Sequence, residues 1–301
     1  MTSPAIHVGC RALDVIDDVQ GARIPVRVLY PTTAAPRTAS FGPYTIDIAD
    51  DAPVAGERLP LVAISHGTGS TPWVFRGLGS DLARAGFAVA LLEHPGNSRN
   101  DDSLAGTPAN LANRPRHVRL ALDAAFADAL VGPHLVPDQA AVIGHSIGGY
   151  TALAVAGGRP MALPSQTPDG VGQPVPVEPD PRVRAAVLLA PALPWFMGPG
   201  ALADVHAPLL VRTAEHDADA RPELTEWVLR SLPTDARVDF QVVPGAGHFA
   251  FLTPFPPALA RPGFPPAQDP PGFDRVAYQP KLLADVVGFL RAALAGAGAQ
   301  T

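Results

Sequence analysis

A serine set between two closely spaced glycines, where an apolar run meets a helix-forming segment, constrains the fold of this chain most strongly. The apolar run is 140–143, the motif is Gly144-His145-Ser146-Ile147-Gly148, and the helix-forming segment is 150–154. A strand that leads directly into a helix leaves room for a one-residue turn, which strains the serine backbone and exposes its hydroxyl. In a chain with 28 glycines the motif alone also fits a turn of small residues. The flanking strand and helix favour a nucleophile elbow.

The composition places the chain among globular proteins and narrows its partners. Apolar residues make up 47% of the 301 residues and charged residues 17%, so a large core can be buried. The net charge is −6 without a basic stripe, which argues against nucleic acid and against an anionic membrane surface as partners. Cys10 is the only cysteine among the 301 residues, so they predict no intrachain disulfide and no cysteine-based metal cluster.

Two stretches bear on targeting and on membrane insertion. Residues 1–7 contain no basic segment leading into an apolar one, so we expect no signal peptide and a cytoplasmic location. Residues 185–203 carry no charge and are long enough to span a bilayer. Because Pro191, Pro194 and Pro199 would break a spanning helix, we expect no membrane span there, but a buried strand followed by an apolar loop.

Short apolar runs alternate with helical periodicity from about residue 59 onward, which is typical of parallel strands joined by crossover helices. Before them, the alternating segments 12–16 and 24–29 predict an antiparallel entry to the sheet. Apolar residues recur at four-residue spacing in 115–130 and in 282–294, which predicts helices there. We expect one α/β domain over 1–301. The strands predicted after residue 59 are 61–65, 88–92, 140–143, 185–189, 209–213 and 238–243.

Two proline-rich segments, near 160–181 and near 254–280, interrupt this alternation and predict irregular structure. The first has few large apolar residues, so we favour a surface excursion over a disordered linker. The second holds Phe255, Phe264 and Phe273. For that segment an ordered flap over a functional site and a disordered linker are both open.

A serine hydroxyl is a weak nucleophile until a base accepts its proton, so the elbow predicts a histidine and an orienting carboxylate later in the chain. His248 stands in a glycine-flanked loop directly after the predicted strand 238–243, at the edge of the sheet where the serine is expected. We predict that His248 is the base. His216 is the competitor, and it is disfavoured because it precedes the last strand.

The carboxylate should follow the preceding strand, 209–213, where the chain offers Glu215, Asp217 and Asp219. We predict Asp217, because enough chain lies between it and both Ser146 and His248 for a strand and a helix. Glu215 and Asp219 stay open as alternatives. The acid would orient the imidazole and stabilise the imidazolium that forms.

Two backbone N–H groups should bind the negative oxygen that develops during attack on a carbonyl. One belongs to Ile147, the residue after the serine. We expect the other from the loop Ser65-His66-Gly67-Thr68-Gly69, which ends an early strand, and we favour Thr68 over Gly67. Glycines let this loop approach a substrate closely, so His66 and Gly67 are candidate substrate contacts.

These residues together resemble the α/β-hydrolase superfamily. More narrowly, the chain is similar to the bacterial group called predicted dienelactone hydrolases, which is related to the platelet-activating-factor acetylhydrolases. The resemblance implies a central, mostly parallel eight-stranded sheet and ester hydrolysis through an acyl-enzyme. Dienelactone hydrolases proper use a cysteine nucleophile, so their activity is not carried over to a chain with Ser146. The segments that carry the likeness are 26–31, 65–69, Glu93-His94, 144–149, Glu215-His216-Asp217 and Gly247-His248.

We therefore expect a serine hydrolase that cleaves carboxylic esters, with a small-molecule substrate. Trp195 and Phe196, which follow a predicted strand, and Phe249 beside His248 favour small to medium apolar acyl groups. Lactonase, amidase and thioesterase activities use the same groups and stay open, as does a non-catalytic binding protein on this scaffold. No His-x-x-x-His pair with a carboxylate partner and no glycine-rich phosphate loop is present, so we expect neither a metal nor a cofactor.

Overall fold

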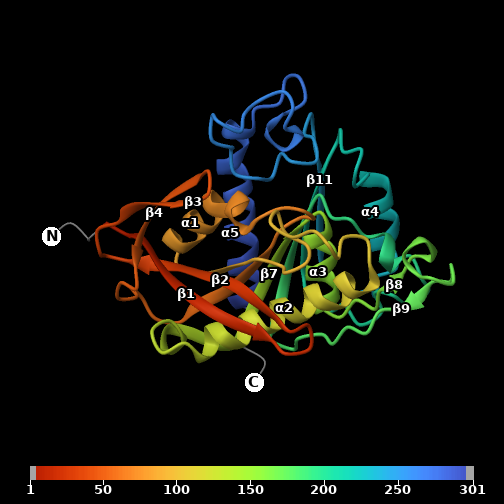
Figure 1. The fold of residues 1–301 in the computed structure, drawn as a ribbon, viewed down its shortest axis with the longest axis horizontal. Coiled ribbons are helices and arrows are strands. Elements are labelled where there is room, and N and C mark those ends of the chain that lie inside the picture. The colour runs from red at the N-terminus through yellow and green to blue at the C-terminus, as the bar shows by residue number, and fades with distance from the viewer. Residues whose placement is uncertain (1–4, 296–301) are drawn as a thin grey trace.

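A ten-stranded sheet forms the centre of the protein in the computed structural model, which describes residues 5–295 (Figure 1). In chain order its strands are β1 (His7–Asp17), β2 (Ala22–Thr32), β3 (Arg37–Phe41), β4 (Tyr44–Asp50), β5 (Leu59–Ser65), β6 (Ala88–Leu92), β7 (Leu135–His145), β10 (Val183–Leu189), β11 (Leu209–Ala214) and β12 (Val238–Val243). Their spatial order is β12-β11-β10-β7-β5-β6-β2-β1-β4-β3. The run from β12 to β6 is parallel throughout, whereas β2 pairs antiparallel with both β6 and β1.

The predicted mostly parallel α/β architecture is confirmed, and every strand predicted from the sequence lies within an observed one. The sheet has ten strands rather than the expected eight. The two additional strands are β3 and β4, which pair antiparallel and extend the sheet beyond β1. Gly42 makes the turn between them with a φ of 59°, a conformation that glycine adopts without steric cost.

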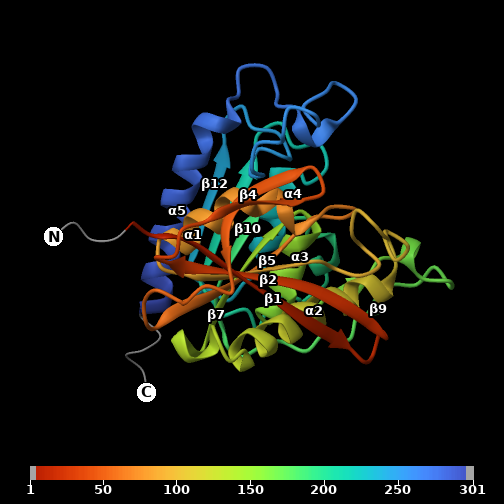
Figure 2. The same ribbon diagram turned by 60° about the vertical axis from the view of Figure 1, so that its left-hand side comes forward.

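Helices cover both faces of the sheet (Figure 2). Alternate residues of a strand point to opposite faces, and β5 shows the result. Leu61 and Ala63 belong to one core cluster, which includes apolar residues of α2 and α3, while Val62 and Ile64 belong to the other, with residues of α1 and α5. The helices are α1 (Arg76–Arg84), α2 (Pro108–Ala127), α3 (Ile147–Val155), α4 (Pro222–Leu229) and α5 (Arg275–Ala295).

Helix α2 begins earlier and ends earlier than the predicted 115–130. It begins at Pro108, where the Thr107 side chain accepts the Asn110 N–H as an N-terminal cap. It ends at Ala127 because Asp128 is extended and its carboxylate accepts two later N–H groups. The helix predicted over 282–294 lies within α5.

Both proline-rich segments contain more regular structure than predicted. The first forms a two-stranded antiparallel sheet of β8 (Met161–Ala162) and β9 (Gln173–Pro174), which projects at the side of the molecule in Figure 1. The second is irregular except for a 3₁₀ turn at Pro265–Ala267 until α5 begins at Arg275. The final part of this segment is therefore helical, with Pro280 inside the helix.

Residues 185–189 form part of the buried strand β10, as expected. A loop with one 3₁₀ turn, Pro194–Phe196, follows. Among residues 5–295, no helix has both the length and the apolar character needed to cross a bilayer.

Candidate active site

The expected sharp turn is present between β7 and α3. Ser146 occupies it with φ 57° and ψ −121°, a region that costs a side-chain-bearing residue on the order of 1–3 kcal/mol. Hydrogen bonds hold it there, because the Ser146 N–H donates to Leu189 O at 3.1 Å and its carbonyl accepts from Ala192 N at 2.9 Å. The strain is thus maintained by the neighbouring strand β10 and the loop after it.

The two glycines of the motif are required by close backbone contacts. A Cβ on Gly144 would lie 1.8 Å from Gly148 O, and a Cβ on Gly148 would lie 2.0 Å from Ser65 O. Neither position can take a side chain unless backbone moves. The second contact also brings the start of α3 against the end of β5.

His248 and Asp217 lie together at the carboxyl edge of the sheet. The Asp217 Oδ2 atom lies 2.8 Å from Nδ1 of His248, and Asp217 Oδ1 accepts the N–H groups of Asp219 and Ala220 at 2.9 and 2.7 Å. Both side chains are buried. Of the three candidate carboxylates Asp217 is the one bonded to the imidazole, whereas Glu215 accepts the Gly245 N–H at 2.7 Å.

Asp217 and His248 also belong to the one group of ligand-type side chains, among the described residues, that could hold a metal ion. Asp217, Asp219 and His248 each offer an atom within 4.8 Å of the others. Both oxygens of Asp217 are already engaged in hydrogen bonds to protein groups. The hydrogen bonding of this group therefore fits an orienting carboxylate better than a metal ligand.

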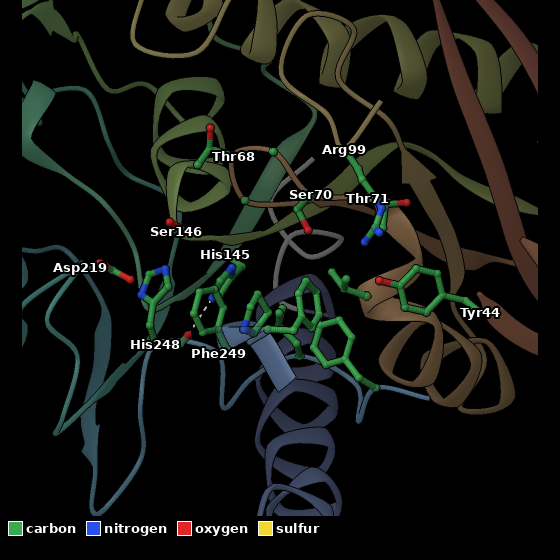
Figure 3. Close-up of a pocket in the computed structure, with 17 residues that line it drawn as sticks. Tyr44, Thr68, Ser70, Thr71, Arg99, His145, Ser146, Asp219, His248 and Phe249 are labelled. Carbon is green, nitrogen blue, oxygen red and sulfur yellow. Dashed lines mark hydrogen bonds between the residues drawn. The ribbon is translucent and has the colours of Figure 1, made fainter. Parts of the chain in front are cut away.

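His145 supports the loop that carries His248. Its Nε2–H donates to the His248 carbonyl at 2.8 Å, and the two ring centroids are 4.8 Å apart (Figure 3). Burial, reinforced by the nearby His248, lowers the pKa of His145 to about 3, so this imidazole is neutral at physiological pH. Nothing in the motif Gly144-His145-Ser146-Ile147-Gly148 predicts this supporting contact.

The loop after β5 passes close to the serine. A Cβ on Gly67 would lie 3.5 Å from the Ser146 Cβ, and Gly67 and Thr68 both line the cavity described below. His66 is fully buried: its Nδ1–H donates to Gly67 O at 2.7 Å, and its Nε2 accepts the His94 N–H at 3.2 Å. His66, which we expected to contact substrate, does not line the cavity and instead stabilises the loop through these buried hydrogen bonds.

A cavity of about 440 Å³ opens above Ser146. Figure 3 shows Ser146 and His248 on one side of it, and Tyr44 and Arg99 on the other. Residues of the second proline-rich segment border the cavity, which is the position expected of a flap. The apolar lining includes Phe249, Leu252, Phe255, Phe264 and Pro266.

Trp195 and Phe196, the other expected substrate contacts, do not line this cavity. Both pack on Tyr150, with ring centroids 4.9 and 5.4 Å away, and Phe196 is 1% exposed. The Trp195 indole N–H donates to Gln166 at 2.8 Å. These side chains join the core on the α3 face of the sheet instead.

Comparisons with known proteins agree with this architecture. Residues 60–226, more than half of the chain, match the family model described as the alpha/beta hydrolase fold. A cutinase from Thermobifida alba is 28% identical over 192 residues, which make up 63% of this chain and 52% of the cutinase. The matched region thus spans about half the length of that relative.

Two solved structures share the fold at low sequence identity. Ferulic acid esterase from Streptomyces cinnamoneus superposes with a TM-score of 0.72 at 21% identity, over 98% of this chain and 93% of that chain. Dienelactone hydrolase from Anabaena variabilis gives 0.57 at 17% identity, over 96% and 99%. With the match of residues 60–226, the expected resemblance is confirmed: the chain belongs to the α/β hydrolase fold family.

Proposed function

We propose that this protein is a serine hydrolase that cleaves carboxylic esters through an acyl-enzyme, with Ser146 as nucleophile, His248 as base and Asp217 as orienting acid. The observation that carries the proposal is the 2.8 Å contact between Asp217 Oδ2 and His248 Nδ1, in a cavity lined by both His248 and the strained Ser146. The similarity to a cutinase and to a ferulic acid esterase supports an ester as substrate.

In this mechanism the Ser146 Oγ attacks the acyl carbon while His248 Nε2 accepts the hydroxyl proton. The imidazolium gives that proton to the departing alkoxide, which leaves as the alcohol. Water then attacks the acyl-enzyme with His248 again as base, and the acid is released with Ser146 regenerated. Asp217 keeps Nδ1 protonated, so Nε2 is the free acceptor in each half of the cycle.

The N–H groups of Ile147 and Thr68 are the proposed donors to the oxyanion. Within residues 5–295, neither group donates to another protein atom, so both are free to bind the substrate oxygen. Thr68 lines the cavity beside Ser146. Loss of one such donor typically lowers kcat by about 10²–10³-fold.

The cavity supports a small to medium apolar acyl group. Its volume is about 440 Å³, and Phe249, Phe255 and Phe264 form an aromatic wall. Cavities of this size and character hold small organic ligands, oriented by a few polar groups.

Labelling with a fluorophosphonate followed by mass spectrometry tests the nucleophile, and p-nitrophenyl esters from acetate to decanoate test turnover. We expect a stoichiometric adduct on Ser146, turnover that peaks at one chain length, and neither in Ser146→Ala. Asp217→Asn should lower kcat by about 10⁴-fold, while the neighbouring Asp219→Asn serves as the matched control. The absence of an adduct would favour a binding protein, and equal activity of Asp217→Asn and the parent would refute the acid.

A further inference from the structure

Helix α2 carries an arginine, Arg114, that is completely buried. Its guanidinium donates to Thr151 Oγ1 at 3.0 Å, Asn97 Oδ1 at 2.6 Å and Ser65 Oγ at 3.1 Å, and also to the His66 carbonyl. All four acceptors are neutral. A buried cation whose direct acceptors are all neutral is costly, and an apolar side chain would fill the same space at lower cost. The Asp102 carboxylate is linked to Arg114 only indirectly here, through Asn97, whose Nδ2 donates to Asp102 Oδ1 at 2.6 Å.

Two of these contacts lead to Thr68. The His66 carbonyl belongs to the loop that ends in Thr68 and Gly69, so Arg114 fixes the backbone at the start of that loop. Asn97, whose carbonyl oxygen Arg114 holds, donates from Nδ2 to the Thr68 Oγ1 at 2.7 Å. The loop is therefore held at both its backbone and its Thr68 side chain.

A third contact leads to Ile147. Thr151, which accepts from Arg114, donates its own hydroxyl to the Ile147 carbonyl at 3.0 Å. Ile147 begins α3 directly after the elbow. One planar guanidinium thus connects the two chain segments that carry the proposed oxyanion donors, although these come from different strand ends.

We propose that Arg114 is a positioning residue that sets the separation and orientation of the Ile147 and Thr68 N–H groups, and that its charge stabilises the developing oxyanion. The inference rests on the proposed function of Ser146. Preorganised donors and a fixed charge in a water-excluded site act more strongly than in water and need no reorganisation during reaction. A misplacement of about 1 Å at such a site can lower the rate by roughly 10²-fold.

The remaining acceptor of Arg114 is the Ser65 hydroxyl, and neutral histidines behind it keep it available. The Ser65 hydroxyl lies 2.8 Å from His94 Nε2, and His94 Nδ1 lies 3.1 Å from His117 Nδ1. Burial lowers the pKa of His94, and lowers that of His117 to about 3. The His117 Nε2–H donates to Gln20 Oε1 at 2.6 Å, so with both rings neutral His117 Nδ1 accepts from His94 Nδ1–H. The His94 Nε2 atom then accepts the Ser65 hydroxyl proton, and Ser65 offers a lone pair to Arg114.

Arg114→Met tests the inference, with Thr151→Val as a milder variant that removes only the link to Ile147. Arg212→Met is the control, since Arg212 is 4% exposed and pairs with Asp239 on the outer strand β12. We would measure kcat and KM for a p-nitrophenyl ester, normalised to the sites that a fluorophosphonate labels at completion. The second readout is the Ki of a trifluoromethyl ketone, whose carbonyl becomes a hemiketal oxyanion when Ser146 adds to it.

For Arg114→Met we expect kcat to fall by about 10²-fold and Ki to rise in parallel, with little change in KM. Thr151→Val should lower kcat and raise Ki by about tenfold each, and it decides the question if Arg114→Met does not fold. Arg212→Met should lower only the melting temperature. Unchanged kcat per labelled site and unchanged Ki in the folded Arg114 or Thr151 variant would overturn the inference. Failure of the parent protein itself to react would instead overturn the proposed function.

Discussion

Mild acid should destabilise this protein strongly, because several histidines are buried in the neutral form. Burial lowers the pKa of His66, His117 and His145 to about 3, and it lowers the pKa of His94 as well. In an unfolded chain a histidine has a pKa of about 6.5. Between these values the unfolded chain binds more protons than the folded protein. The free energy of unfolding therefore has its full value above about pH 6.5 and decreases as the pH falls below it.

The magnitude follows from the difference in proton binding. At pH 5, each histidine that is neutral in the fold and has an unfolded pKa of about 6.5 lowers the free energy of unfolding by about 2 kcal/mol. His66, His117 and His145 together therefore lower the free energy of unfolding by about 6 kcal/mol, and a typical protein has a net stability of about 5–15 kcal/mol. Much of the free energy of unfolding should be gone at pH 5.

Urea unfolding followed by far-UV circular dichroism at pH 7.5, 6 and 5 measures this loss. His117→Gln should remove up to one proton from the difference in proton binding between the unfolded and folded states. The slope of the unfolding free energy against pH should therefore fall by up to about 1.4 kcal/mol per pH unit. The exposed His206 provides the control, because His206→Gln removes an imidazole that contacts solvent in both states. A parent protein whose unfolding free energies at pH 7.5 and pH 5 agree within about 1 kcal/mol would refute the reasoning.

Three further predictions concern the elbow and the cavity. In urea unfolding, Ser146→Gly should be more stable than Ser146→Ala by about 1 kcal/mol, because glycine accepts the backbone angles of φ 57° and ψ −121° without strain. Equal free energies of unfolding would contradict this. Gly148→Ala should lose about 1–3 kcal/mol of stability and most ester turnover, because its Cβ would meet Ser65 O at 2.0 Å. Phe264→Ala should move the preferred p-nitrophenyl ester towards longer acyl chains by enlarging the cavity, and an unchanged preference would place the acyl group elsewhere.

The parallel part of the sheet was predictable because its strands are buried on both faces and read as continuous apolar runs. All five residues of β6 are buried, and no polar residue interrupts the pattern. Strand β4 has a different signature: Tyr44, Ile46 and Ile48 point inward and the residues between them are exposed. This alternation with a period of two is also typical of a strand, but it is spread over a short polar segment, and the β3–β4 hairpin was missed.

The expected positions of Ser146, Asp217 and His248 follow from strand ends, because parallel strands bring their carboxyl ends to one edge. The cavity wall has no such rule. Tyr44 comes from the distant strand β4, and Phe255 and Phe264 come from an irregular segment. Trp195 also follows a strand end. The chain after β10, however, turns towards the α3 face of the sheet, and Trp195 packs there against Tyr150 of α3.

Arg114 had a signal in the sequence that the helix prediction did not use. It stands four residues before Val118, in line with the apolar stripe that continues through Leu122, and all three side chains are buried. An arginine on the buried stripe of a helix must bring its charge into the core, where it needs acceptors for its five N–H donors. Which acceptors it finds depends on Asn97 and Thr151, whose approach to α2 is set by the tertiary fold. The sequence can therefore reveal that a buried cation exists, whereas its connection to both proposed oxyanion donors emerges only from the packed structure.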